Sequence, residues 1–423
     1  MGTANKRIKS IILIAVLCCL GLVLFFKQSA EPEGTYVPIA TNQNNGYAYA
    51  GSSTCVACHK DIYEQHKNTA HFNTSGLATN ATVKGSFLKG ENRFELNEYV
   101  TYHMVENEGK LFQNAYINGI ERKSETFDVF VGSGTKGQTY LYWAEDKLFQ
   151  LPVSYHIAVD GWINSPGYPN DKPLYNRPVL TRCLECHSTY FENKVPKDVW
   201  SNEFSKEKSI YGIDCESCHG PSHDHVEYHT EHPEELLGKN IKSWSKLSRK
   251  KQLDGCALCH SGRRVMKSAP FSFMPGDDLE NFSTPDYSPG DIATLDVHGN
   301  QYGLLTASQC FINSDEMTCV TCHNPHKKER NDLKTFSLRC MGCHDDIVQT
   351  SGHMTEFGTE TLDNCIDCHM PKMASNVLTF LTGKSDIPDS LKVRTHLIGI
   401  YDLAFAKEVA EIEEWIEGID SNQ

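Results

Sequence analysis

The sequence has no excess of basic residues. It contains 40 Lys and Arg against 54 Asp and Glu, which gives a formal net charge of −14. This balance argues against nucleic acid as a partner, because phosphates require a basic protein face. An acidic surface would instead steer a basic partner protein toward the chain.

Long apolar runs are also scarce, and the one that stands out is near the N-terminus. It extends from Ile11 to Phe26, 16 residues that follow Lys6, Arg7 and Lys9, which is typical of an export signal. The run is short for a spanning helix of about 20 residues, yet Gln28 does not suit a cleavage site. A cleaved signal peptide and a retained membrane anchor over residues 1–30 therefore both stay open. Either one exports the chain to the periplasmic side, tethered to the inner membrane or released.

Cysteine, by contrast, is abundant and almost never isolated. Of 17 cysteines, Cys18 and Cys19 lie in the apolar run, Cys310 stands alone, and 14 form seven Cys-x-x-Cys pairs, each followed at once by histidine. This spacing is the signature of haem c attachment, in which two thiols bond to one porphyrin and the histidine binds its iron. The pairs are Cys55 and Cys58, Cys183 and Cys186, Cys215 and Cys218, Cys256 and Cys259, Cys319 and Cys322, Cys340 and Cys343, and Cys365 and Cys368.

Other uses of paired cysteines fit the pattern less well. Zinc ribbons combine two pairs in one site, and seven pairs cannot combine evenly. Thioredoxin-like pairs occur singly and need no histidine behind them. We therefore expect seven covalently bound haem c groups with iron. Their proximal ligands would be His59, His187, His219, His260, His323, His344 and His369.

The haem motifs also organise the chain. Six motifs occupy residues 183–369, which leaves too little protein for an ordinary apolar core around each haem. We expect a mainly α and irregular multihaem cytochrome c fold with a haem-packed core, and short helical pieces and loops between the motifs. Alternating, aromatic-rich runs with hairpin signals predict a small β-rich insert after the first haem. The expected segments are a linker (31–50), a first haem segment (51–84), the insert (85–175), a six-haem domain (176–397) and an amphipathic C-terminal helix (398–423).

Chain reach constrains the second axial ligands. His326 comes three residues after His323, at most about 10 Å along an extended chain. Two histidines on opposite faces of one haem need Cα atoms roughly 12 to 13 Å apart. If His326 is a ligand, it therefore belongs to a neighbouring haem.

The stretches "CVACHKDIYEQHKNTAH", "CESCHGPSHDHV" and "CVTCHNPH" resemble the multihaem cytochrome c group that includes octahaem cytochromes, hydroxylamine oxidoreductase-like proteins and cytochrome c nitrite reductase. The resemblance covers about residues 51–75 and 176–397 and leaves the insert out. It implies six distal ligands and a packing role for His66, where the group often has Trp. The six are His71, His225, His298, His326, His353 and His396, and a seventh would be His156 or His229.

An iron with two imidazoles has no open position and changes charge with little rearrangement, so such haems carry electrons. The sequence thus favours an exported seven-haem electron carrier, with membrane-associated redox donor and acceptor proteins as partners. The alternative is an oxidoreductase in which one open haem acts on a small nitrogen or sulfur compound. The nitrite reductases of the group typically have a CxxCK motif, which this sequence lacks. A third reading is a module of a larger assembly. Arginines near the motifs are candidate partners for haem propionates: Arg177, Arg182, Arg263, Arg264, Arg339 and Arg394.

Overall fold

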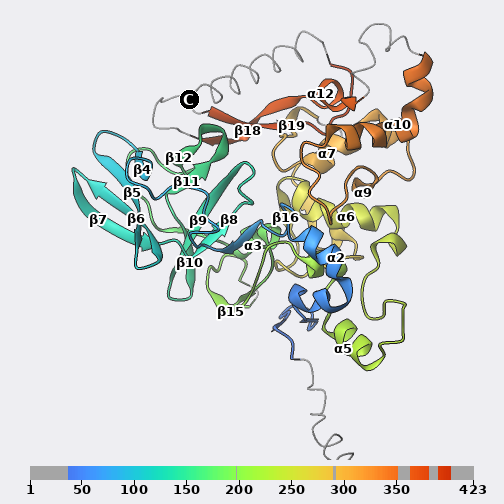
Figure 1. Ribbon diagram of the computed structural model, residues 1–423, viewed down its shortest axis with the longest axis horizontal. Helices are drawn as coiled ribbons and strands as arrows, with labels where there is room; N and C mark the ends of the chain where they lie inside the picture. Colours follow the sequence, from blue (N-terminus) through green and yellow to red (C-terminus); the bar gives the residue numbers. More distant parts are fainter. Residues whose placement is uncertain (1–36, 197, 289–291, 351–362, 381–388, 402–423) are drawn as a thin grey trace, which may run out of the picture.

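The computed structural model describes residues 37–196, 198–288, 292–350, 363–380 and 389–401 (Figure 1). The expected signal or anchor, the ligand candidate His353 and nearly all of the expected C-terminal helix lie outside these residues. Helix and strand take similar shares, about 27% and 28%. Among the described residues, no helix has the length and apolar character needed to cross a membrane.

Within the segment 85–175 the first sheet is a four-stranded meander. Its order is β4-β5-β6-β7, and both β5 and β6 are followed by two-residue turns. The turns Glu108–Gly109 and Asn118–Gly119 have positive φ angles, between 50° and 76°. Positive φ at both turn residues is what a tight hairpin between twisted strands requires. The strands are Arg93–Glu95, Val100–Asn107, Lys110–Ile117 and Ile120–Thr126.

A second sheet of seven strands packs against the meander. Its path is β12-β11-β9-β10-β13, and β8 joins β9 to β3, which follows the first motif. The side chains between the two sheets form an apolar core with Tyr102, Tyr140 and Leu151 completely buried. The strands are β3 Ser75–Leu77, β8 Val129–Val131, β9 Gly137–Ala144, β10 Lys147–Gln150, β11 Val153–His156, β12 Gly161–Asn164 and β13 Arg177–Pro178.

The motif-bearing segments contribute mostly short helices. They are α2 Val56–His66, α3 Thr181–His187, α4 Cys215–His219, α5 His223–Glu231, α6 Arg249–His260, α7 Gln301–Thr306, α8 Gln309–Ile312, α9 Cys319–Cys322, α10 Leu333–Thr350 and α12 Ile366–His369. Single-turn 3₁₀ segments lie at Ser52–Cys55, Ile157–Val159, Trp244–Lys246, Leu279–Asn281 and Ile292–Thr294.

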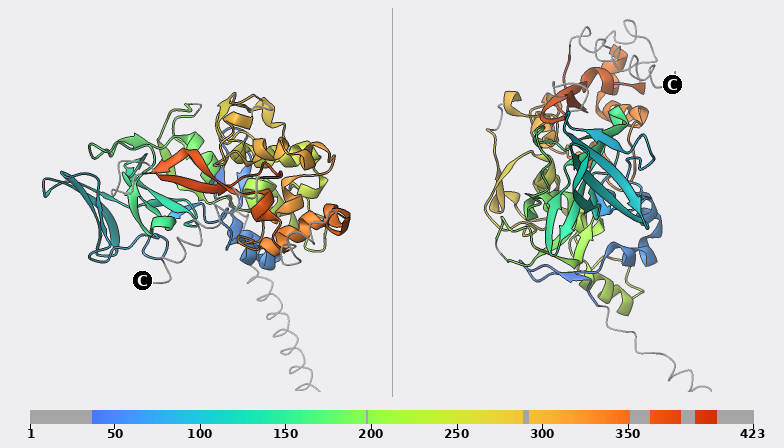
Figure 2. Two further views of the ribbon diagram at one scale, coloured as in Figure 1. Left: turned by 90° about the horizontal axis from the view of Figure 1, so that it is seen from above. Right: turned by 90° about the vertical axis from the view of Figure 1, so that its left-hand side faces the viewer.

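Four two-stranded sheets complete the fold. Three of them lie between or after the motifs, where the sequence suggests only helical pieces and loops. The pairs are β1 Ala40–Thr41 with β2 Ala48–Tyr49, β14 Ser188–Asn193 with β15 Phe204–Tyr211, β16 Arg264–Met266 with β17 Ser283–Pro285, and β18 Lys372–Phe380 with β19 Asp389–Arg394. The β18–β19 pair starts beside α12 and extends across to the insert (Figures 1 and 2).

The apolar cores are unevenly distributed. A second cluster joins the insert to β14 and β15 through Leu148, Tyr190, Phe191 and Phe204. A third cluster, within the motif-bearing segments, has only three buried members: Ala257, Phe273 and Leu279. The segments that carry most motifs therefore have little apolar core of their own among the described residues.

Candidate haem sites

Each attachment motif folds in the same local way. One helical turn brings the two cysteines, three residues apart, to one face of the helix. The histidine that follows stands where the helix ends or kinks. His187, His219, His260 and His369 are the last residues of their helices, and His323 caps α9. His59 and His344 have non-helical backbone angles inside α2 and α10.

Cysteines of the first six motifs line one large cavity of about 2040 Å³. Ordinary small-molecule sites measure roughly 300 to 1,000 Å³, so this cavity is large enough for more than one bulky cofactor. Its walls carry the chemistry that haem c needs, thiols and imidazoles together. Among the lining residues are Cys55, Cys58, Cys186, Cys215, Cys218, Cys256, Cys259, Cys319, Cys322 and Cys340, with His59, His71, His219, His225, His260, His323, His326 and His396.

Three pairs of imidazole rings across this cavity, each of one proximal histidine and one predicted distal ligand, have the spacing of axial ligands. His219 and His326 have ring centres 6.1 Å apart, and His323 and His396 have the same separation. The centres of His71 and His260 are 6.0 Å apart. A fourth pair, His66 and His326, has ring centres 6.2 Å apart but contains no proximal histidine. Two metal–imidazole bonds of about 2.0 Å, plus about 1.1 Å from each nitrogen to its ring centre, give about 6.2 Å. The interplanar angles of 7°, 29° and 74° are all compatible with two imidazoles on one iron, because each ring would be free to rotate about its bond to the metal.

Two further proximal histidines have a predicted distal ligand as a charge neighbour. Burial lowers the pKa of His187, and the next cause is the neighbouring His298. Burial also lowers the pKa of His225, with smaller contributions from His229, His59 and His219. Five of the six predicted distal ligands thus lie near a proximal histidine, each from a different motif. The sixth, His353, lies outside the described residues.

Neighbouring attachment sites also approach each other through their cysteines. Direct thiol contacts join Cys55 to Cys215, Cys186 to Cys259, and Cys256 to Cys319. In a protein with haem attached, these sulfurs would be the thioethers at the edges of adjacent porphyrins. The first and third sites, the second and fourth, and the fourth and fifth are therefore adjacent.

Comparison with known proteins agrees with this chemistry. The profile of the family described as cytochrome c554 and c-prime matches residues 170–220, the stretch that contains α3 and α4 with two motifs. The chain is 26% identical over 201 residues to multiheme cytochrome MtrA of Shewanella baltica (strain OS185). Both matches support a multihaem cytochrome c. The match to MtrA covers 45% of this chain and 52% of the relative, so the chain spans about half of that protein's length. No solved structure matches this chain significantly.

Backbone carbonyls orient several of the candidate ligand rings. Nδ1 of His219 donates to the carbonyl of Lys242 (2.9 Å), and Nδ1 of His225 donates to that of Lys239 (2.7 Å). His369 makes the same bond to Gly399 (2.8 Å). A metal-binding histidine commonly donates its other ring nitrogen in this way, which fixes the tautomer. Nε2 remains as the atom for iron.

Burial keeps other ligand rings neutral. Desolvation, reinforced by the neighbouring His260, lowers the pKa of His71 to about 4. Desolvation and the neighbouring His323 lower the pKa of His396 to about 4. The neutral imidazole is the form that binds a metal. These two rings are therefore already neutral at neutral pH and do not have to lose a proton before they bind iron.

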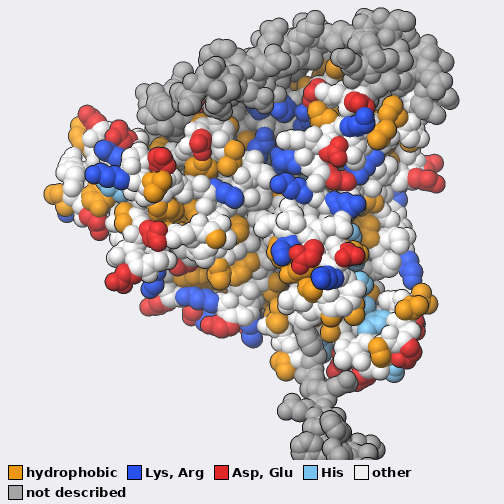
Figure 3. All heavy atoms as spheres, in the orientation of Figure 1, with side chains coloured by type: hydrophobic (Ala, Val, Ile, Leu, Met, Phe, Trp, Pro, Cys, Tyr) orange, Lys and Arg blue, Asp and Glu red, His pale blue; other side chains and the backbone are white. Residues whose placement is uncertain are grey.

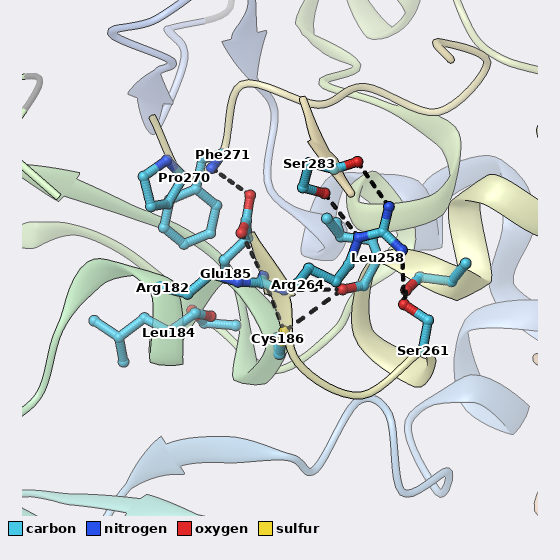
Figure 4. Close-up of polar contacts among 12 residues, drawn as sticks. Arg182, Leu184, Glu185, Cys186, Leu258, Ser261, Arg264, Pro270, Phe271 and Ser283 are labelled. Atoms are coloured by element: carbon cyan, nitrogen blue, oxygen red, sulfur yellow. Dashed lines mark hydrogen bonds and ion pairs between the residues drawn. The ribbon is translucent and has the colours of Figure 1, made fainter. Parts of the chain in front are cut away.

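Buried carboxylates inside the motifs join the sites, and sequence reasoning missed them. Glu185, the third residue of its motif, accepts from Nη1 of Arg182 (2.5 Å) and from the backbone N–H of Phe271 (2.7 Å) (Figure 4). Arg182 also donates to the carbonyl of Leu258 in the fourth motif (3.1 Å). Glu216 accepts from the N–H groups of Ala50 and Gly51 beside the first motif and from Ser222. An acidic residue between the two cysteines is the signal that could have identified both.

The arginines near the motifs are bound to protein groups in the structure. Arg264 is buried and donates to Ser261 and to both oxygens of Ser283 (Figure 4). Arg339 pairs with Glu329, and Arg394 with Asp367. Arg263 pairs with Asp286, and Arg177 donates to the carbonyl of Pro166. Their role as propionate partners stays a prediction.

The two candidates for a seventh distal ligand lie in different places: His229 lines the large cavity, and His156 is buried in β11. The ring of His156 contacts that of Phe380 at a tilt of 31°, with centres 4.1 Å apart. Nε2 of His229 accepts from the N–H of Lys239 (3.3 Å). His66, expected to pack, has both ring nitrogens 3.1 Å from carbonyl oxygens, those of Pro325 and Ile213.

Proposed function

We propose that this cytochrome relays electrons through seven covalently bound haem c groups, most of them held by two histidines. The observation that carries the proposal is the set of three imidazole pairs with ring centres 6.0 to 6.1 Å apart. A haem bound between two such rings supplies reversible one-electron chemistry with little rearrangement. The protein's part is to fix the rings and to exclude other ligands.

Contacts between sites support a continuous relay. The thiol contacts connect the first site to the third, and the fifth to the second through the fourth. His326 belongs to the chain segment of the fifth motif, yet its ring faces His219 of the third. Five sites are thereby linked in one series. The cofactors would also fill the large cavity, so we extend the proposal to a haem-packed core.

The partners and location belong to the same proposal. We infer redox donor and acceptor proteins at an exported, periplasmic location, because both readings of the N-terminal apolar run imply export. The surface presents charges of both signs, and Lys and Arg side chains gather on the face shown in Figure 3, between the insert and the motif-bearing segments. Because the chain has a net charge of −14, we expect a partner protein with a basic face to bind at another part of its surface.

His326→Ala tests the ring pairs in the haem-loaded protein. We expect one haem to change from low spin to high spin, because the partner of His219 is lost while every attachment cysteine remains. Electron paramagnetic resonance and a potentiometric titration measure the change. His103→Ala is the matched control, since His103 lies on β5 in the insert and its ring contacts that of Tyr116. If His326→Ala leaves all haems low-spin with unchanged potentials, the pairing is wrong.

A further inference from the structure

The charged residues that line the large cavity are mostly basic, although the chain as a whole is acidic. Eight Lys or Arg residues line the cavity against four Asp or Glu, whereas the whole sequence has 40 against 54. Of the acidic four, Glu185, Asp214 and Glu216 are buried. The fourth, Glu329, pairs with Arg339. Six of the eight basic residues are exposed, so the cavity lining presents mainly positive charge at the protein surface.

Three of these cations follow a predicted iron ligand in the loop between α9 and α10. Lys327, Lys328 and Arg330 come directly after His326, and all three are exposed. Among the residues that the structure describes, none forms an ion pair with these three side chains. We call Lys327, Lys328 and Arg330 the basic patch.

The acidic residues of the same loop cancel little of this charge. Glu329 accepts from the backbone N–H of Asn324 (3.0 Å) and pairs with Arg339 (2.6 Å), so an internal cation already balances it. Asp332 is the one other acidic residue between α9 and α10. Three cations against one remaining carboxylate leave the loop with a local excess of positive charge.

The basic patch lies beside the third haem site. The ring of His326 faces that of His219, with centres 6.1 Å apart, and the Cα atom of Lys327 lies about 3.8 Å from that of His326. On the other side of this ring pair, Nδ1 of His219 donates to the carbonyl of Lys242, which is exposed and lines the cavity. Exposed cations therefore flank both candidate ligands of one haem site.

We propose that the basic patch docks the acidic face of a one-electron redox protein beside the haem of the third site. This inference rests on the proposed electron relay and gives it one of its partner surfaces. Opposite charges steer two proteins into contact and raise the rate of encounter by about 10- to 1,000-fold. Because the chain is acidic overall, an acidic partner is repelled by most of its surface and attracted at the patch. One electron passes between the partner's redox group and the haem iron, which changes between the ferric and ferrous states.

Reduction of the oxidised, haem-loaded protein by flavodoxin hydroquinone tests the proposal, because flavodoxin is an acidic protein that donates single electrons. Each transfer converts one flavin from hydroquinone to semiquinone and one haem from ferric to ferrous. The triple variant Lys327→Gln, Lys328→Gln, Arg330→Gln should lower the second-order rate constant in stopped-flow mixing about tenfold at low ionic strength. At about 1 M salt, where the screening length is about 3 Å, the variant and the wild type should react equally fast.

A matched triple variant changes the net charge by the same amount at another place. It neutralises three exposed cations of the insert, Lys89→Gln, Lys110→Gln and Arg122→Gln, and should react like the wild type. The single variant Lys328→Gln disturbs the loop less than the triple change. It should slow the reaction roughly twofold, as one of three charges with a combined effect of about tenfold.

The outcomes separate docking from other uses of the same charges. Equal rate constants for the two triple variants would overturn the proposal, as would a wild-type rate constant that does not fall with salt. An unchanged rate constant together with a shifted potential of one haem would also overturn it, because the three cations would then serve that haem's propionates. The proposed relay fails on different evidence, a haem content other than seven or a mostly high-spin spectrum, and neither depends on the charge of the patch.

Discussion

The β-rich insert and the motif-bearing segments have different kinds of interior. The insert has two sheets that bury Tyr102, Tyr140 and Leu151 completely. The motif-bearing segments have a cluster of three buried apolar residues and surround a cavity of about 2040 Å³. Protein interiors are normally close-packed with few large voids. The insert therefore carries its own core, whereas the other region is built around something it must bind.

Hydrogen bonds show the same contrast. In the insert, buried Gln113 bonds with both ends of its amide to the backbone of Val153 on the facing sheet. In the motif-bearing region, buried carboxylates such as Glu216 connect one attachment motif to the segment before another. The insert's polar bonds close a finished core. Those of the other region position short segments around the cavity.

Removal of haem should affect the two regions most differently. We expect protein produced without haem attachment to lose order around α6 and α10 while the insert keeps its sheets, because only the insert packs on itself. Hydrogen exchange measures this: amides of α6 should lose most of their protection, and those of β5 and β6 should stay protected. The haem-loaded protein is the control. Equal protection of α6 in both forms would contradict the dependence on haem.

A smaller effect is expected from a truncation inside the insert, which should destabilise the insert and leave the haem sites unchanged. Leu151→Ala removes a completely buried side chain and should cost about 2 to 5 kcal/mol of unfolding free energy. Urea unfolding followed by the strand signal in circular dichroism measures the loss, while the haem spectrum of the folded protein should not change. Leu88→Ala is the matched control, since Leu88 is 69% exposed. A similar loss in both variants would mean that Leu151 is not part of a tight core.

The attachment chemistry and the insert could be predicted from the sequence more clearly than the pairing of axial ligands. A CxxCH motif is local, so its thiols and proximal histidine can be identified within five residues. The strands β5 and β6 alternate apolar and polar residues beside tight turns, which is also a local signal. By contrast, His71 meets His260 across 189 positions of sequence, and no short pattern encodes which motif a distal ligand serves. Only the reach of the chain, as between His323 and His326, excluded a pairing in advance.

Two features escaped prediction for a related reason. The β18–β19 hairpin has an irregular register between Ala374 and Thr379, so its sequence lacks a clean alternation. Glu185 and Glu216 occupy positions of the motif that the attachment chemistry leaves free, and their value comes from contacts with remote segments. His156 and His229, the two candidates for a seventh distal ligand, likewise make contacts, with Phe380 and with the N–H of Lys239, that no short sequence pattern predicts.

The smallest expected effect concerns the pH dependence of one buried carboxyl group beside the cavity. Burial, with the nearby Glu216, raises the pKa of Asp214 from its usual 3.8 to about 7. Between pH 4 and 7 the folded protein therefore holds a proton that the unfolded chain has lost, so this group makes folding less favourable as the pH rises. Asp214→Asn removes the titration, and the asparagine oxygen can still accept from the N–H of Glu216, as Asp214 does at 2.9 Å.

The unfolding midpoint of haem-loaded Asp214→Asn, measured relative to that of the wild type, should thus rise by about 2 to 4 °C from pH 5 to pH 8. Asp61→Asn, on the exposed face of α2, should show no such trend. An Asp214→Asn difference that is the same at both pH values would show that Asp214 is already ionised in the folded cytochrome. In that case the buried carboxyl group of Asp214 would be charged as well as hydrogen-bonded. The region around the cavity would then contain a buried charge in addition to its small apolar core.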